Sequence, residues 1–79
     1  IVLPSALAAR GPAIASGFLA SLTLGAGQFC TNPGLMLAVE GPGLDAFLQA
    51  VGALIPDSAA STMLTPGIQE AYVSGVERL

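Results

Sequence analysis

The stretch Leu35-Met36-Leu37-Ala38-Val39 is the part of the sequence that decides the predicted fold. It is a continuous apolar run, which is typical of a strand buried on both faces, and a turn at residues 40–43 follows it. Ile1 to Leu3 form a second, shorter apolar run that Pro4 ends. Two uniformly apolar strands joined by a helix predict parallel pairing through a right-handed crossover.

Three helices are predicted around these two strands. The first covers residues 12–24, with a proline in its first turn and glycines after its last residue. A second, amphipathic helix covers residues 44–55 and is closed by Pro56. The third follows Thr65, which can cap a helix, and has Pro66 at its first position. The predicted fold class is therefore α/β, in the order strand-helix-strand-helix-helix.

The small share of charged residues bears on the domain organisation. The chain has 79 residues, of which 53% are hydrophobic and only 9% are charged, whereas globular domains average about 25% charged residues. Such a chain either lies in a membrane or comes from the interior of a larger protein. The uncharged stretch between Arg10 and Glu40 is long enough for a membrane span. However, its middle has loop character from Gly25 to Gly34, which would leave backbone groups unpaired in lipid.

We therefore interpret residues 1–79 as part of a larger, parallel-sheet catalytic domain and not as a complete domain. A small apolar interaction module without catalysis and a membrane-associated peptide remain the alternatives. Arg10 and Arg78 are the only basic residues, so no patch is available to neutralise phosphates, which excludes nucleic acid as a partner. A single cysteine and no histidine exclude a zinc site and a histidine base.

Cys30 is the strongest candidate for a catalytic residue in this sequence. It lies in the loop at residues 27–34, between the first predicted helix and the second predicted strand, and Gln28 and Asn32 stand on either side of it. Loops between rigid elements are where proteins place reactive groups, and a thiolate is a good nucleophile toward carbonyl carbon. The alternative is a buried structural thiol that packs as a small apolar side chain.

The loop resembles a known signature. Gly27-Gln28-Phe29-Cys30 is similar to the active-site cysteine motif G-Q-x-C of the aldehyde dehydrogenase superfamily. The longer strings at residues 22–34 and 65–68 are similar to the NADP-preferring branch of that superfamily that oxidises 2,5-dioxopentanoate, which is α-ketoglutaric semialdehyde. The resemblance covers essentially the whole chain, but only a small part of a family member.

The resemblance implies a role for each residue of the loop. Cys30 would be the nucleophile that attacks the aldehyde, giving a thiohemiacetal whose hydride passes to a nicotinamide and then a thioester that water hydrolyses to the acid. Its backbone N–H would donate to the oxyanion, and Phe29 and Thr31 would line the aldehyde pocket. The amide of Gln28 is expected to tether the loop, and Asn32 with Pro33 is expected to shape the turn.

The resemblance also implies that much of the catalytic site lies outside this chain. The general-base glutamate would come just before Ile1, and the second oxyanion donor and the Gly-rich turn that binds NADP (or NAD) would lie elsewhere. The chain alone is therefore expected to be inactive. Its expected partners are the aldehyde substrate and the remainder of the enzyme, with no membrane partner, and the enzyme is expected to be a cytoplasmic homo-oligomer.

Overall fold

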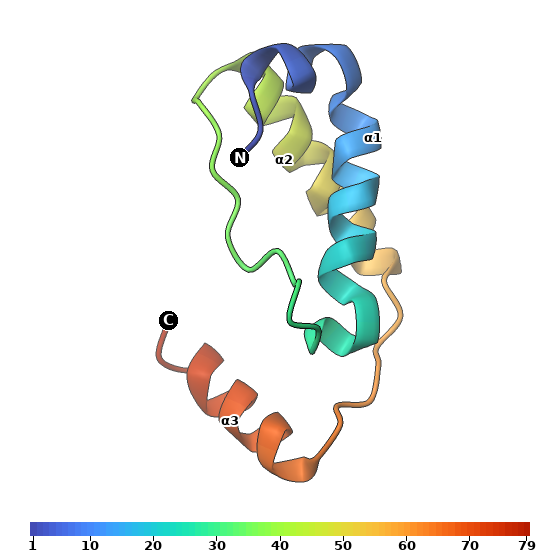
Figure 1. Ribbon diagram of the computed structural model, residues 1–79, viewed down its shortest axis with the longest axis vertical. Coiled ribbons are helices and arrows are strands. Elements are labelled where there is room, and N and C mark those ends of the chain that lie inside the picture. The colour runs from blue at the N-terminus through green and yellow to red at the C-terminus, as the bar shows by residue number, and fades with distance from the viewer.

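The computed structural model describes all 79 residues and consists of helices joined by turns and extended segments (Figure 1). The α-helices are α1 (Pro4–Thr23), α2 (Pro42–Leu54) and α3 (Pro66–Val76). A short 3-10 helix continues each of the first two, η1 (Leu24–Gly27) after α1 and η2 (Ile55–Asp57) after α2.

The predicted α/β class is wrong for this chain, because the structure has no strand and no sheet. Residues 1–3 and 35–39 meet only at one isolated parallel bridge, between Val2 and Ala38. One hydrogen bond accompanies it, from the Val2 N–H to the Leu37 carbonyl at 2.9 Å. The pairing cannot extend at the first segment because Pro4 starts α1 directly after Leu3. Two strands are also too few for a stable sheet.

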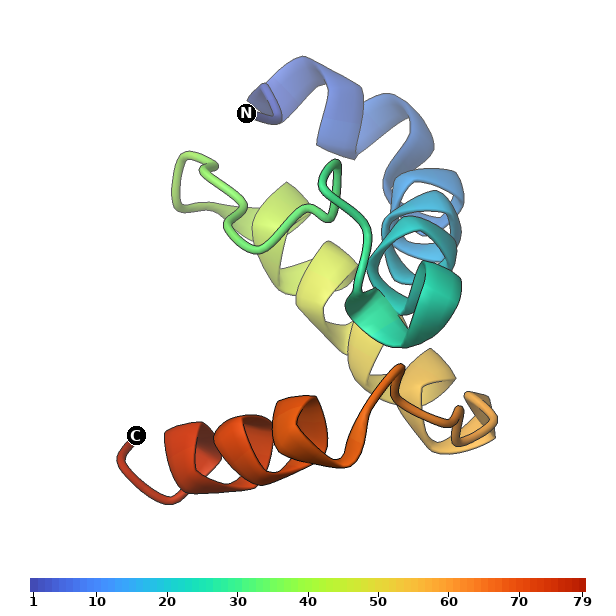
Figure 2. The ribbon, with the colours of Figure 1, turned by 60° about the horizontal axis from the view of Figure 1, so that its bottom comes forward.

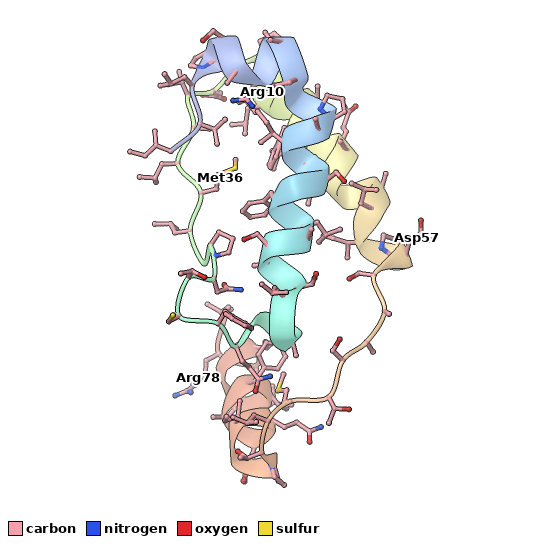
Figure 3. The ribbon with its side chains drawn as sticks, turned by 45° about the vertical axis from the view of Figure 1, so that its right-hand side comes forward. Arg10, Met36, Asp57 and Arg78 are labelled. Atoms are coloured by element: carbon pink, nitrogen blue, oxygen red, sulfur yellow. The ribbon has the colours of Figure 1, made fainter.

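The segment at residues 35–39 is extended but buried on one face only. Met36 and Ala38 are half-buried and pack against the core, and Figure 3 shows Met36 pointing toward α1. Leu35, Leu37 and Val39 are exposed, with Leu35 at 80%. The prediction of burial on both faces was therefore wrong, because no second layer covers the outer face in this chain.

Helix α1 begins earlier than predicted and is kinked. It starts at Pro4, and Arg10 has non-helical torsion angles of φ −149° and ψ 30°. Pro12 lies two residues after this break, so it stands in the first turn of the second helical part, as predicted. A proline in a first turn loses no intrahelical hydrogen bond, whereas one in a helix interior breaks the helix.

Helices α1 and α2 pack side by side and run in the same general direction (Figure 1). Their contact buries Leu7, Ala15 and Phe47. The rings of Phe18 and Phe47 meet edge to face with centroids 5.8 Å apart, a favoured arrangement of aromatic pairs. At Gly43 a Cβ atom would stand 3.1 Å from the Leu7 Cβ, so a glycine allows the two backbones to approach.

Helix α3 lies apart from this pair, beyond the linker that follows η2 (Figure 2). Its predicted start is confirmed: the Thr65 hydroxyl accepts a hydrogen bond from the Ile68 N–H at 3.2 Å, and Pro66 is the first helical residue. None of the residues of α3 is buried. Helix α3 is therefore formed by local capping and backbone hydrogen bonds more than by packing.

Many large apolar side chains of this chain are exposed to solvent. Only 4 of its 79 residues are buried, and exposed side chains such as Ile55, Leu64 and Tyr72 lie on several elements. The helical stretch Pro4–Gly27 is long and apolar enough to cross a membrane, a test that the core helix of a soluble protein also passes. The kink at Arg10 interrupts this stretch near its start.

Candidate functional site

The cysteine loop, residues 27–34, starts where α1 ends in a tight left-handed turn. Gly25, Ala26 and Gly27 have φ values of 58°, 57° and 75°. Two glycines in this turn cost little, because glycine adopts positive φ readily. The prediction that the glycines at 25 and 27 end the helix is confirmed. Ala26 was not singled out by the sequence, and its left-handed backbone costs about 1–2 kcal/mol.

Cys30 is an exposed, free thiol at the centre of a turn. The Asn32 N–H donates to the Phe29 carbonyl at 3.0 Å, which leaves Cys30 and Thr31 as the two central residues. The backbone N–H groups of Cys30 and Thr31 donate no hydrogen bond within the chain. The thiol and an unpaired backbone donor are therefore presented to solvent together, and the alternative of a buried structural thiol does not describe this chain.

The side chains on either side of the turn hold it to the end of α1. The Asn32 Nδ2 donates to the Leu22 carbonyl at 2.8 Å, and the Gln28 Nε2 donates to the Gly25 carbonyl at 2.8 Å. Both acceptors are carbonyls at the end of a helix, and the Gly25 carbonyl also accepts from the Gln28 backbone N–H at 3.1 Å. The predicted tether by Gln28 is confirmed, and Asn32 shapes the turn as predicted.

The Gln28 side chain has a second partner that the sequence did not indicate. Its Oε1 accepts a hydrogen bond from the Leu64 N–H at 2.7 Å, across 36 positions of sequence. No local pattern connects these two residues, so only the folded chain shows that they meet.

Phe29 and Thr31, predicted to line the aldehyde pocket, are both exposed and stand next to Cys30 in the turn. The Phe29 ring folds back over Gly25, where two of its carbons lie 2.9 Å from the place a Cβ would occupy. The structure therefore places Phe29 and Thr31 beside the thiol without closing a pocket over it.

A cavity of about 440 Å³ lies on the other side of the loop, toward α3. Cys30 does not line it. Its walls are mainly apolar and come from the end of α1, the loop and the start of α3: Leu22, Ala26, Gly27, Gln28, Asn32, Met63, Ile68 and Tyr72. No carboxylate lines this cavity.

Substituting Gly25 tests the left-handed turn that positions the loop. We expect Gly25→Ala in the full-length protein to lower the free energy of unfolding by about 1–2 kcal/mol, because a side chain at φ 58° is strained. The added Cβ would also displace the Phe29 ring. Urea unfolding measures this change.

Gly17→Ala is the matched control for Gly25→Ala. Gly17 lies inside α1, and nothing stands within 4 Å of its added Cβ. The substitution Gly17→Ala should therefore raise the free energy of unfolding by about 0.5–1 kcal/mol. If Gly25→Ala were as stable as the unmodified protein, this result would contradict the left-handed backbone conformation of Gly25.

The sequence was compared with known proteins, and the matches cover the whole chain. No protein-family model matches it. It is 54% identical over all of its 79 residues to "Alpha-ketoglutaric semialdehyde dehydrogenase 2" of Azospirillum brasilense. It is 38% identical over the same residues to "Alpha-ketoglutaric semialdehyde dehydrogenase" of Acinetobacter baylyi. The chain spans 15% of the length of each of these relatives.

Proposed function

We propose that this chain is the nucleophile-bearing segment of an enzyme that oxidises an aldehyde to a carboxylic acid. Its sequence is aldehyde dehydrogenase-like over its whole length. The observation that carries the proposal is the 54% identity, over the full chain, to a protein named as an α-ketoglutaric semialdehyde dehydrogenase. That name makes 2,5-dioxopentanoate the substrate we propose. The exposed thiol of Cys30 at the centre of a tethered turn supports it.

The proposed work of Cys30 is covalent catalysis. Its thiolate attacks the aldehyde carbon, a C–S bond forms, and the π electrons of the carbonyl move onto oxygen. The unpaired N–H of Cys30 is available to donate a hydrogen bond to that oxygen, the stabilisation that acyl chemistry needs. A nicotinamide bound to the full-length enzyme would accept the hydride of that carbon, which would leave a thioester, and water would then release the acid and restore the thiol.

Phe29 and Thr31 are proposed to contact the substrate around the thiol. Both are exposed neighbours of Cys30 in the same turn. The Phe29 ring would provide an apolar wall, and the Thr31 hydroxyl can donate or accept a hydrogen bond. Together they would orient the aldehyde for attack.

The acceptor of the hydride is proposed to be NADP or NAD, but the residues of this chain do not fit a dinucleotide site. A pyrophosphate is usually held by a Gly-rich turn at a helix N-terminus, whereas α1 begins with Pro4-Ser5-Ala6. The two basic residues, Arg10 and Arg78, come from α1 and from the end of the chain, and neither lies in the cysteine loop (Figure 3). We therefore assign only the covalent part of the reaction to this chain and derive no step through the cofactor.

The large exposed apolar surface agrees with the proposal that residues 1–79 form part of a larger catalytic domain. Side chains such as Leu35, Leu37 and Val39 would then be covered by the remainder of the enzyme. A cytoplasmic location is a proposal from the resemblance. Assembly into a homo-oligomer remains a proposal from the resemblance.

Oxidation of 2,5-dioxopentanoate by the full-length protein tests the proposed function. With NADP or NAD present, we expect the formation of reduced nicotinamide and of the dicarboxylic acid, with kcat of roughly 1–10³ s⁻¹. Absorbance of the reduced cofactor and mass spectrometry of the acid measure the two products. A simple aldehyde without a carboxylate is the control and should show a lower kcat/KM. No acid above the enzyme-free rate would contradict the proposal.

A further inference from the structure

We propose that Gln28 is a positioning residue for Cys30, because its side-chain amide connects the cysteine loop to the segment that leads into α3. This inference rests on the proposed function, in which Cys30 is the nucleophile. It adds a residue whose effect on the reaction comes from holding the loop and not from touching the substrate.

The amide of Gln28 bonds two parts of the chain at once. Its Nε2 donates to the Gly25 carbonyl at 2.8 Å, and its Oε1 accepts from the Leu64 N–H at 2.7 Å. Leu64 directly precedes Thr65, the residue that caps α3. A single planar group therefore sets the distance between the end of α1 and the start of α3.

Little else fixes this distance. The bond between Gln28 and Leu64 is the one hydrogen bond that joins residues 59–79 to the rest of the chain. Helix α3 buries no residue, and a cavity of about 440 Å³ separates its first turns from the loop. Because packing is sparse between the two parts within this chain, the bond between Gln28 and Leu64 is the contact of this chain that holds them in place.

The position of Gln28 in the loop links this contact to the thiol. Gln28 stands two residues before Cys30, and Asn32, two residues after it, is held at the Leu22 carbonyl. The turn is thus tied on both sides. Removal of the Gln28 amide leaves the backbone bond from the Gln28 N–H to the Gly25 carbonyl at 3.1 Å and removes the contact with Leu64. A displacement of about 1 Å at a reacting group can cost on the order of 10²-fold in rate.

The test compares three variants of the full-length protein. Gln28→Met keeps the length of the side chain and removes both hydrogen bonds, whereas Gln28→Glu keeps an acceptor for the Leu64 N–H. Gln49→Met is the matched control, because Gln49 is an exposed residue of α2 whose side chain makes no hydrogen bond in the structure. Circular dichroism verifies that each variant is folded before the other measurements.

Three readouts separate positioning from a general structural role. In Gln28→Met we expect the Leu64 amide to exchange hydrogen about threefold to tenfold faster, since a hydrogen bond contributes modestly. In Gln28→Glu its exchange should stay within about twofold of the unmodified protein, since the acceptor is kept. For Gln28→Met, kcat should fall by roughly tenfold to 100-fold with KM changed less than about threefold. In Gln28→Met, the rate at which iodoacetamide alkylates Cys30 should change in the same direction as kcat.

Several results would overturn the inference. Unchanged exchange at Leu64 in Gln28→Met would show that the contact does not hold this segment. Faster exchange with unchanged kcat and unchanged alkylation would show a structural contact that does not position the thiol, as would an equal loss of kcat in Gln49→Met. Exchange and alkylation are measured without substrate, so they test Gln28 even where the proposed function fails. That failure is detected separately, by full activity of Cys30→Ala.

Discussion

Replacing Cys30 by alanine in the full-length protein is expected to abolish aldehyde oxidation, with kcat lowered on the order of 10⁴- to 10⁶-fold. Loss of a covalent nucleophile has an effect of this size because the variant can no longer form the acyl intermediate. Cys30→Ser is expected to be almost as inactive, because an unassisted hydroxyl is a far weaker nucleophile than a thiolate.

Steady-state rates with 2,5-dioxopentanoate, followed by cofactor reduction, measure this loss. Ser58→Ala is a suitable control, since Ser58 is an exposed residue after η2 and outside the cysteine loop. Iodoacetamide gives an independent measurement: peptide mass spectrometry should place the adduct on Cys30, and the aldehyde should slow its formation. Full activity in Cys30→Ala would refute the assignment of the nucleophile.

The features of the fold that could be predicted are the ones encoded locally. Thr65 and Pro66 start α3 because a capping hydroxyl and a fixed φ act on the next few residues. The glycines at 25 and 27 end α1 because they adopt positive φ. Both predictions required no knowledge of distant parts of the chain.

The predicted sheet failed because a strand depends on its neighbours. A continuous apolar run such as residues 35–39 indicates burial, but it does not say what covers each face. In this chain α1 and α2 cover the face of Met36 and Ala38, and nothing covers the other. A parallel pair needs further strands or layers for stability, so the two runs meet only at the Val2–Ala38 bridge.

In the candidate site, too, local features could be predicted from the sequence and contacts between distant residues could not. The tether by Gln28 could be predicted from the resemblance of the loop, and its bond to the Gly25 carbonyl is local. The bond from Leu64 could not, because the two residues are 36 positions apart and no periodicity relates them. Ala26 also escaped prediction, since alanine carries no signal for a left-handed backbone.

Phe47→Ala is expected to be among the most destabilising single substitutions in this chain. Phe47 is 2% exposed and is the largest side chain buried completely between α1 and α2. Truncation of such a ring leaves a cavity and removes its contacts, which costs about 3–5 kcal/mol. The free energy of unfolding of a domain is only about 5–15 kcal/mol, so the variant should lose a large part of its stability.

Urea unfolding of the full-length protein measures this loss, and two further variants identify its cause. Phe47→Leu keeps most of the volume and should cost about 1 kcal/mol. Phe18→Ala combined with Phe47→Ala should show a coupling of about 0.5–1.5 kcal/mol, because the two rings pack edge to face at 5.8 Å. A cost below about 1 kcal/mol for Phe47→Ala would show that the α1–α2 contact is not a core of the full-length protein.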